Sequence, residues 1–166
     1  VNPRFTESLI PVEWVEAKRT REKTRATLQA AKDAFEAGRC IVMFPAGRLA
    51  RRAPDGSLVD PEWATTAVSL AVKYKAPIIP VHVAGPNSFW FHSFNRISPE
   101  LRDITLFHEL LNKAGKRFDL TFGPAIDASA VDMETSAFCA ALKAYVERDL
   151  QAQPDLSFTG GVHADT

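Results

Sequence analysis

The segment Cys40-Ile41-Val42-Met43-Phe44-Pro45-Ala46-Gly47-Arg48 changes abruptly from five apolar residues to loop residues. It follows a charged stretch, from about Thr20 to Ala37, in which apolar residues recur at helical spacing and after which Gly38 is a stop signal. A short apolar run after a helix is typical of a strand that is buried on both faces of a parallel sheet. We therefore expect a buried strand at 40–44, with the loop at its carboxyl end.

Downstream of this loop, the chain alternates again between helix and strand signals. Asp60 and Pro61 are residue types preferred at the N-cap and the first position of a helix, so we expect a helix that runs to about Lys75. The apolar run 76–83 predicts a second buried strand, and the alternating pattern at 117–123 predicts a late strand. This order predicts an α/β domain with a mostly parallel or mixed central sheet flanked by helices.

Three further elements complete the expected domain. The run 9–15 predicts an irregular strand, and the stretch 98–113, before Gly115, predicts a helix. The last expected helix has an apolar face formed by Phe138, Leu142, Tyr145, Val146 and Leu150. We expect residues 1–150 to belong to one domain and residues 151–166, which lack periodicity, to form a tail.

The overall composition excludes several classes of protein. The 166 residues contain 20 Lys and Arg and 20 Asp and Glu, so there is no basic surplus of the kind that marks nucleic-acid binding. No apolar run approaches the roughly 20 residues of a spanning helix, and the amino terminus lacks the pattern of a signal peptide. Cys40 and Cys139 lie far apart in apolar surroundings, which predicts two buried thiols in a reducing compartment.

The turn at Pro45 to Arg48 is the sharpest local feature. In open α/β sheets, ligands bind at the carboxyl ends of the strands. Gly47 allows close approach of the backbone to a ligand, and the planar guanidinium of Arg48 suits a phosphate or a carboxylate. Arg51 and Arg52 add positive charge nearby. The pattern predicts an anion site, although the same spacing also fits an ordinary turn with solvated arginines.

Other residue types give weaker signals. His82 lies in an apolar run, which favours a hydrogen-bonded core histidine, and no histidine has the spacing of a metal ligand set, so we expect no metal site. The aromatic segment 89–94 fits either contact with a bilayer interface or an acyl channel, or a loop folded over a small second core.

Four segments follow one another in a characteristic order. They are Val12-Glu13-Trp14-Val15-Glu16 followed by Lys18 and Arg19, Phe44-Pro45-Ala46-Gly47-Arg48, Ala76-Pro77-Ile78-Ile79-Pro80-Val81, and Phe118-Asp119-Leu120-Thr121-Phe122-Gly123-Pro124-Ala125-Ile126. Together they resemble the sequence blocks of the glycerolipid (lysophospholipid) acyltransferase superfamily, which includes 1-acylglycerol-3-phosphate acyltransferases. The chain is most similar to its bacterial hemolysin-like branch, and the resemblance covers nearly the whole chain.

The resemblance implies which residues bind substrate. The family's third block, usually Phe-Pro-Glu-Gly-Thr-Arg, helps to hold a phosphate-bearing acceptor. Here Ala46 replaces the glutamate, while Arg48 and Leu49 replace the threonine and arginine, which argues against a standard glycerol-phosphate acceptor but leaves Arg48 for an anionic head group. The substrate-binding residues implied in this way are Phe44, Pro45, Ala46, Gly47, Arg48, Lys18, Arg19, Arg51 and Pro80.

The family's catalytic base is a histidine followed five positions later by an aspartate. The residues five positions after His82, His92 and His108 are Asn87, Ile97 and Lys113, and His163 is too close to the end. The resemblance therefore implies that no catalytic residue lies in this chain, that the base lies upstream of Val1, and that the chain by itself is inactive as an enzyme.

The expected function is that of an O-acyltransferase of lipid biosynthesis and phospholipid metabolism. It would transfer an acyl group from acyl-CoA or acyl carrier protein to a lysophospholipid-like or other lipid hydroxyl, with no further cofactor. Its partners would be the lipid acceptor and the acyl thioester, with peripheral membrane contact at the cytoplasmic inner face and no nucleic acid. The alternative is a non-catalytic module that binds a lipid or an anionic ligand.

Overall fold

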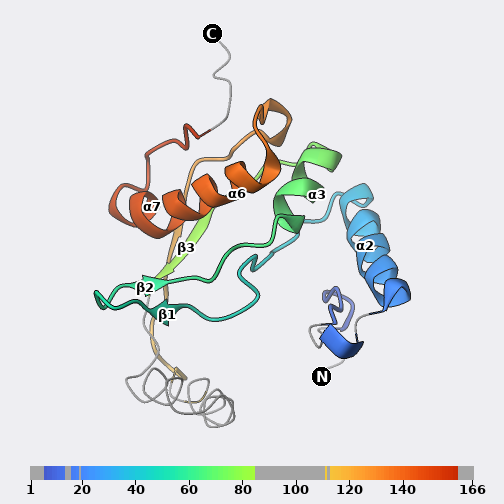
Figure 1. Ribbon diagram of the computed structural model, residues 1–166, viewed down its shortest axis with the longest axis horizontal. Coiled ribbons are helices and arrows are strands. Elements are labelled where there is room, and N and C mark those ends of the chain that lie inside the picture. Colours follow the sequence, from blue (N-terminus) through green and yellow to red (C-terminus); the bar gives the residue numbers. More distant parts are fainter. Residues whose placement is uncertain (1–5, 14–15, 19, 85–110, 112, 161–166) are drawn as a thin grey trace. The chain divides into compact units, whose positions relative to one another are not determined.

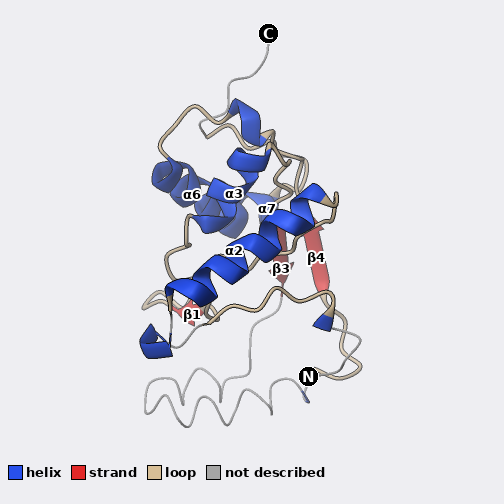
Figure 2. Ribbon diagram, turned by 90° about the vertical axis from the view of Figure 1, so that its right-hand side faces the viewer, coloured by secondary structure: helices blue, strands red, loops and turns tan. Residues whose placement is uncertain are grey.

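The structure, a computed structural model, describes residues 6–13, 16–18, 20–84, 111 and 113–160. The chain divides into two compact units, Val1–Met43 and Phe44–Thr166. Figure 1 shows the elements in chain order, and Figure 2 separates helices from strands by colour.

The first unit is built on helix α2, Arg21–Glu36. The Oγ1 atom of Thr20 accepts a hydrogen bond from the Lys23 N–H (3.2 Å), and the left-handed Gly38 (φ +67°) follows the last turn. The helix expected at 20–37 is therefore confirmed, with both of its end signals. A short 3-10 helix, η1, Glu16–Lys18, precedes α2.

Residues 9–13 have no strand structure, so the strand expected at 9–15 is wrong over its described part. This segment is held by side chains of α2 and not by a neighbouring strand. The Thr27 hydroxyl donates to the Pro11 carbonyl oxygen (2.7 Å), and Lys23 forms a 2.7 Å ion pair with Glu13.

The apolar run 40–44 also differs from the prediction, because it is neither a strand nor buried. Val42 is 77% exposed and Phe44 is 78% exposed, and the thiol of Cys40, which was expected to be buried, is exposed as well. A strand is stable only when a neighbour takes its backbone hydrogen bonds, and no described residue pairs with this run.

The core of the second unit lies between two helical regions. Helix α3 spans Thr66–Tyr74, and the carboxyl-terminal region runs through α6, Thr135–Ala144, a π-helical turn η3, Tyr145–Asp149, and α7, Leu150–Ala152 (Figure 1). All five residues of the predicted apolar face are buried, which confirms the last helix. The buried cluster comprises Val68, Ile126, Phe138, Cys139, Leu142, Tyr145, Val146 and Leu150.

Helix α3 begins later than the sequence predicts. The N-cap is Thr65 and not Asp60, and Thr65 makes no capping hydrogen bond with its side chain. The carboxylate of Asp60 instead accepts a hydrogen bond from the indole N–H of Trp63 (3.0 Å). Lys75, in the left-handed region at φ 52°, ends the helix near the expected position.

Strands β3, Val81–Ala84, and β4, Asp119–Phe122, form an antiparallel pair, which an isolated bridge between Ile78 and Ile126 extends. Helix α7 packs against both strands. On one face, Nδ1 of the half-buried His82 lies 3.1 Å from the Val146 carbonyl oxygen, as expected for a core histidine. These pairings confirm the late strand and a strand at the end of the run 76–83. The expected burial of that strand is wrong, because Val81 is 38% exposed and Val83 is 51% exposed. Both described strand pairs are antiparallel, so the parallel part of the expected sheet stays a prediction.

The aperiodic segment after α7 packs onto the same core. The ring of Phe158 makes edge-to-face contacts with Phe138 (5.3 Å between centroids) and Tyr145 (5.4 Å). The Tyr145 hydroxyl donates to the Leu156 carbonyl oxygen (2.6 Å). The hydrophobic periodicity of the sequence does not predict that this segment packs on the core, because the contact depends on one aromatic side chain, Phe158, and not on a repeating pattern.

Several predictions fall outside the described residues: Trp14 and Val15, Arg19, the aromatic segment 89–94, most of the helix 98–113, and the histidines 92, 108 and 163. In the part of the chain that is described, no helix has both the length and the apolar character to cross a bilayer. Those same residues also hold no cluster of side chains suited to a metal ion.

Candidate functional site: an arginine-bearing loop

The predicted binding turn belongs to a closed loop, residues 45–64, which we call the arginine loop. The chain enters it at Pro45 and leaves it at Ala64, whose N–H donates to the Pro45 carbonyl oxygen (3.0 Å). Inside the loop, strands β1, Arg51–Arg52, and β2, Leu58–Val59, pair in antiparallel register. The loop therefore carries three arginines, at positions 48, 51 and 52, on a backbone that is hydrogen-bonded at its base and its middle.

The turn at the start of the loop is tight and exposed. The Gly47 N–H donates to the Phe44 carbonyl oxygen (3.1 Å), with Pro45 in the second position, where its fixed φ suits a turn. Gly47 has φ +59°, and an added Cβ there would meet nothing within 4 Å, so the backbone angle is what calls for glycine. Arg48 is thus exposed to solvent, and two apolar residues of the same segment, Phe44 (78% exposed) and Leu49 (48% exposed), are exposed as well.

Two of the three acidic residues of the loop accept hydrogen bonds from residues nearby in the sequence. The Asp55 carboxylate accepts hydrogen bonds from the Ser57 hydroxyl (2.6 Å) and N–H (2.9 Å), which lower the pKa of Asp55. Asp60 accepts from Trp63, as described above. None of the ion pairs formed among the described residues includes Arg48. The positive charge of the turn is therefore available to an anion from solution.

The far end of the loop is anchored to the carboxyl-terminal helices. Glu147 accepts the Asp60 N–H on Oε1 (2.7 Å) and the Lys143 ammonium on Oε2 (2.8 Å), and both of these ion-paired side chains are more than 80% buried. The Sγ atom of Cys139 lies 3.7 Å from the Trp63 carbonyl oxygen. Burial, assisted by the charge of Glu62, raises the pKa of Cys139, so this thiol stays protonated near neutral pH and is a structural group.

The predicted binding residues fall into three groups. Residues 44–48 and Arg51 lie together at the start of the arginine loop. Pro80 lies elsewhere in the second unit, buried, and its carbonyl oxygen accepts the Gly123 N–H (2.9 Å). Lys18 is exposed in η1 of the first unit, and Arg19 lies outside the described residues.

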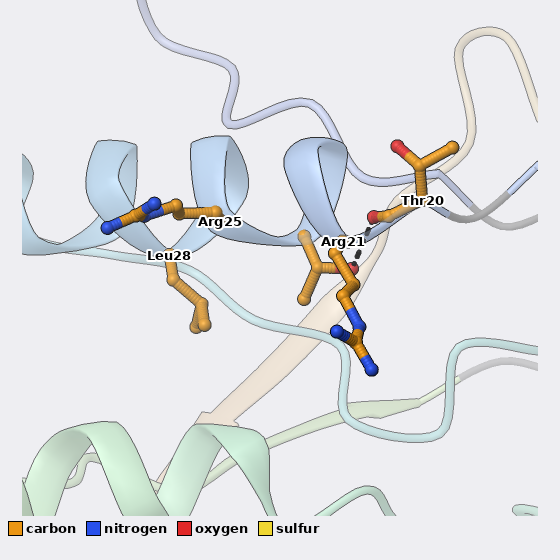
Figure 3. A pocket seen from close by; sticks show the side chains of 5 residues that line it. Thr20, Arg21, Arg25 and Leu28 are labelled. Carbon is orange, nitrogen blue, oxygen red and sulfur yellow. Dashed lines mark hydrogen bonds between the residues drawn. The ribbon is translucent and has the colours of Figure 1, made fainter.

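A second basic feature was not predicted from the sequence. Thr20, Arg21, Thr24, Arg25 and Leu28 line a shallow surface hollow of about 410 Å³ on the first turns of α2 (Figure 3). Arg21 and Leu28 extend to the same side of the helix, and the Thr24 hydroxyl donates to the Thr20 carbonyl oxygen (3.1 Å). The spacing i, i+4 of the two arginines is the signal that could have found it, because such residues are neighbours on a helix.

Comparison with known proteins connects these features to an activity. The sequence profile of the Acyltransferase family matches residues 2–84, which are 83 of the 166 residues and include α2 and the whole arginine loop. No solved structure gives a significant match.

Two curated bacterial proteins are similar to this chain. A lyso-glycine lipid O-acyltransferase of Phocaeicola vulgatus is 29% identical over 120 residues, which are 69% of this chain and 43% of that protein. A lyso-glycine lipid O-acyltransferase of Bacteroides thetaiotaomicron is 30% identical over 104 residues, which are 59% of this chain and 38% of that protein. The matched region is therefore less than half the length of either relative. The family match and both relatives agree with the order of the sequence blocks, and the chain belongs to the glycerolipid acyltransferase superfamily.

Proposed function

We propose that this chain provides the acceptor-binding part of a lipid O-acyltransferase, with Arg48 as the residue that binds the acceptor's anionic head group. The observation that carries the proposal is the exposed turn 44–48, which lies within the family-matched residues and exposes Arg48 together with the apolar residues Phe44 and Leu49 of the same segment. Both similar proteins are named for O-acylation of a lysolipid, which supports a lipid acceptor.

The chemistry of the turn suits an amphipathic acceptor. The guanidinium of Arg48 can bind a carboxylate or a phosphate through two parallel hydrogen bonds. Phe44 and Leu49 offer apolar surface to the alkyl part of the same molecule. A lysolipid combines an anionic head group with an alkyl chain, whereas a small hydrophilic anion would use only the charge.

In the proposed reaction, the acceptor hydroxyl oxygen attacks the thioester carbonyl of acyl-CoA or acyl carrier protein. A carbon–oxygen ester bond forms, the carbon–sulfur bond breaks, and the thiol leaves. A general base takes the hydroxyl proton, and this proton finally resides on the thiol. We propose that the base is a histidine outside these 166 residues, because none of the four histidines here is followed by the paired aspartate.

We also propose that the protein works at the cytoplasmic face of a membrane. The exposed apolar side chains that flank Arg48 support contact with a lipid surface, where arginine meets head groups and apolar residues enter the acyl region. Both cysteines are free thiols, which fits a reducing compartment.

The complete domain would have a larger sheet than the one described, mixed or mostly parallel. Within the described residues, β3 pairs only with β4, and each strand has four residues. Such a pair needs further strands or cover for independent stability.

Acyl transfer by the complete gene product tests the function. It would be incubated with acyl-CoA or acyl carrier protein thioesters and with three acceptors: lyso-glycine lipid, lysophosphatidate and neutral monoacylglycerol. We expect an ester product from an anionic lysolipid, detected by mass spectrometry. Binding of the anionic lysolipid without any product would instead support the alternative of a non-catalytic binding module.

A further inference from the structure

We propose that Glu147, held by Lys143, is a positioning residue that fixes the arginine loop in the arrangement in which Arg48 meets the acceptor. This inference rests on the proposed function of the loop. It assigns a role to two residues that lie in α6 and the π-helical turn η3, outside the family-matched part of the chain and far from the turn in sequence.

The contacts form a continuous path. Glu147 Oε1 accepts the Asp60 N–H (2.7 Å), and the Asp60 carboxylate accepts the Trp63 indole N–H (3.0 Å). The next residue, Ala64, donates its N–H to the Pro45 carbonyl oxygen (3.0 Å), and Pro45 begins the turn that ends at Arg48. Each pair of consecutive groups in this path is joined by a hydrogen bond or a covalent bond, so a displacement of Glu147 would shift the backbone of the turn.

The turn has little else to hold it. Phe44 is 78% exposed, and among the described residues the Ala64–Pro45 hydrogen bond is the one that ties the turn to the rest of its unit. Loops with exposed backbone and few buried contacts open most readily. The hydrogen bond at Asp60 limits this opening because it holds the start of the segment 60–64, and Ala64 is the last residue of that segment.

Glu147 suits this role because both of its oxygens are used. One oxygen of Glu147 forms a 2.8 Å ion pair with Lys143, which neutralises the charge of the carboxylate. The other oxygen accepts the backbone N–H of Asp60. Among substitutions of Asp60, only proline would remove this N–H. Both side chains of the ion pair are less than 20% exposed, so the pair is screened little by solvent and the carboxylate stays in place.

The test compares Glu147→Ala with Glu147→Gln in the complete gene product. Alanine removes both contacts, whereas glutamine keeps an oxygen that can accept the Asp60 N–H. For Glu147→Ala we expect faster hydrogen exchange at the Ala64 amide and an acceptor KM raised about tenfold, with the thioester KM unchanged; tenfold corresponds to about 1.4 kcal/mol. Glu147→Gln keeps the acceptor for the Asp60 N–H but loses the ion pair with Lys143, so we expect both values between those of Glu147→Ala and the parent protein.

The control is Leu150→Ala, which opens a cavity in the core and removes none of the hydrogen bonds of this path. It should lower the melting temperature and leave the Ala64 exchange and the acceptor KM unchanged. The inference is overturned if Glu147→Ala leaves the Ala64 exchange rate unchanged, or speeds the exchange without raising the acceptor KM. If Arg48→Ala leaves acceptor kinetics unchanged while Glu147→Ala still speeds the exchange, the anchor stands structurally but the proposed function of Arg48 fails.

Discussion

The Asp60 N–H donates a hydrogen bond of 2.7 Å to Oε1 of Glu147, although the two residues lie 87 positions apart in the sequence. This contact joins the end of the arginine loop to the carboxyl-terminal helices. Asp60 precedes α3, which begins at Thr66, and its carboxylate accepts the Trp63 indole N–H. In our proposal, the position of the turn at 44–48, in the first third of the chain, depends on a helical region close to its end.

Arg48→Ala should weaken use of an anionic acceptor. Loss of a hydrogen bond between charged groups costs about 1.5–3 kcal/mol, so we expect the acceptor KM to rise at least tenfold while the thioester KM stays constant. For Arg48→Lys we expect an acceptor KM between those of the parent protein and Arg48→Ala, because an ammonium group cannot form the bidentate contact. Steady-state kinetics with each substrate varied in turn measures this.

The control for this experiment is Arg117→Ala, which removes an arginine of the same unit whose side chain is 88% exposed and pairs with Asp119. It should leave both KM values unchanged. An equal effect of the two substitutions would mean that Arg48 acts only through the net charge of the protein.

The two thiols should differ strongly in reactivity. Cys40 is exposed, whereas Cys139 is buried and its pKa is raised, so its reactive thiolate form is scarce near neutral pH. We expect one rapidly labelled thiol with a maleimide in the folded protein and two after denaturation. Cys40→Ser should abolish the rapid phase; a rapid phase that survives in this variant would contradict the burial of Cys139.

Gly123→Ala should destabilise the second unit. An added Cβ would lie 2.9 Å from Leu150 Cδ1 and 2.9 Å from the Tyr145 hydroxyl, in a region where Leu150 is fully buried. Overpacking of this kind costs about 1–3 kcal/mol in the free energy of unfolding. Urea denaturation measures the loss.

A double-mutant cycle with Tyr145→Phe checks the cause. Because this change removes one of the two clashing atoms, the cost of Gly123→Ala should be smaller in the Tyr145→Phe background. Additive costs would show that the hydroxyl is not part of the clash.

The free energy of unfolding should fall at low pH. The cause is protonation of two carboxylates that accept hydrogen bonds from serines two positions later in the sequence. Hydroxyl and N–H groups of Ser129 and Ser136 lower the pKa values of Asp127 and Glu134 below their ordinary 3.8 and 4.5. A lowered pKa in the folded state gives stability that is present above the ordinary pKa and is lost as the pH falls through the folded value. The loss should therefore begin below about pH 4.5.

Asp127→Asn combined with Glu134→Gln removes these two titrations and should flatten the acid limb of a plot of stability against pH. The measurement is the urea midpoint between about pH 3 and pH 6. Parallel acid limbs for the variant and the parent protein would assign the acid sensitivity to other groups.

The segment after α7 should contribute to the core despite its aperiodic sequence. Phe158→Ala removes the edge-to-face contacts with Phe138 and Tyr145, which add about 0.5–1.5 kcal/mol to the effect of lost burial. We expect a lower melting temperature, and Phe158→Leu should recover part of it because it restores apolar volume. An unchanged melting temperature for Phe158→Ala would show that this segment is not docked in solution.

Local patterns in the sequence predicted several elements well. Helix α2 was predicted from about Thr20 with its stop at Gly38, and β4 was predicted from alternation. The apolar face of the last helix was predicted residue by residue. These features depend on neighbours within a few positions, so the chain encodes them directly. The arginine turn and the family blocks were also visible without a structure, because they are contiguous motifs.

Other features required knowledge of distant neighbours. The run 40–44 has the composition of a buried strand, but a strand also needs a pairing partner, and within the described residues none pairs with it. Asp60 has the side chain of a helix cap, yet the indole of Trp63 occupies its carboxylate. The local sequence shows which contacts a residue is able to make, and the tertiary structure decides which of those contacts it makes.

The sequence by itself determined the family, the positions of the main helices and the placement of Arg48 in an exposed turn. Only the tertiary structure decided that this turn belongs to a loop closed by Ala64 and Pro45 and anchored on Glu147. The reason is physical: periodicity and turn residues act over one to a few helical turns, whereas a hydrogen bond across 87 positions exists only once packing of the core has brought its two partners together.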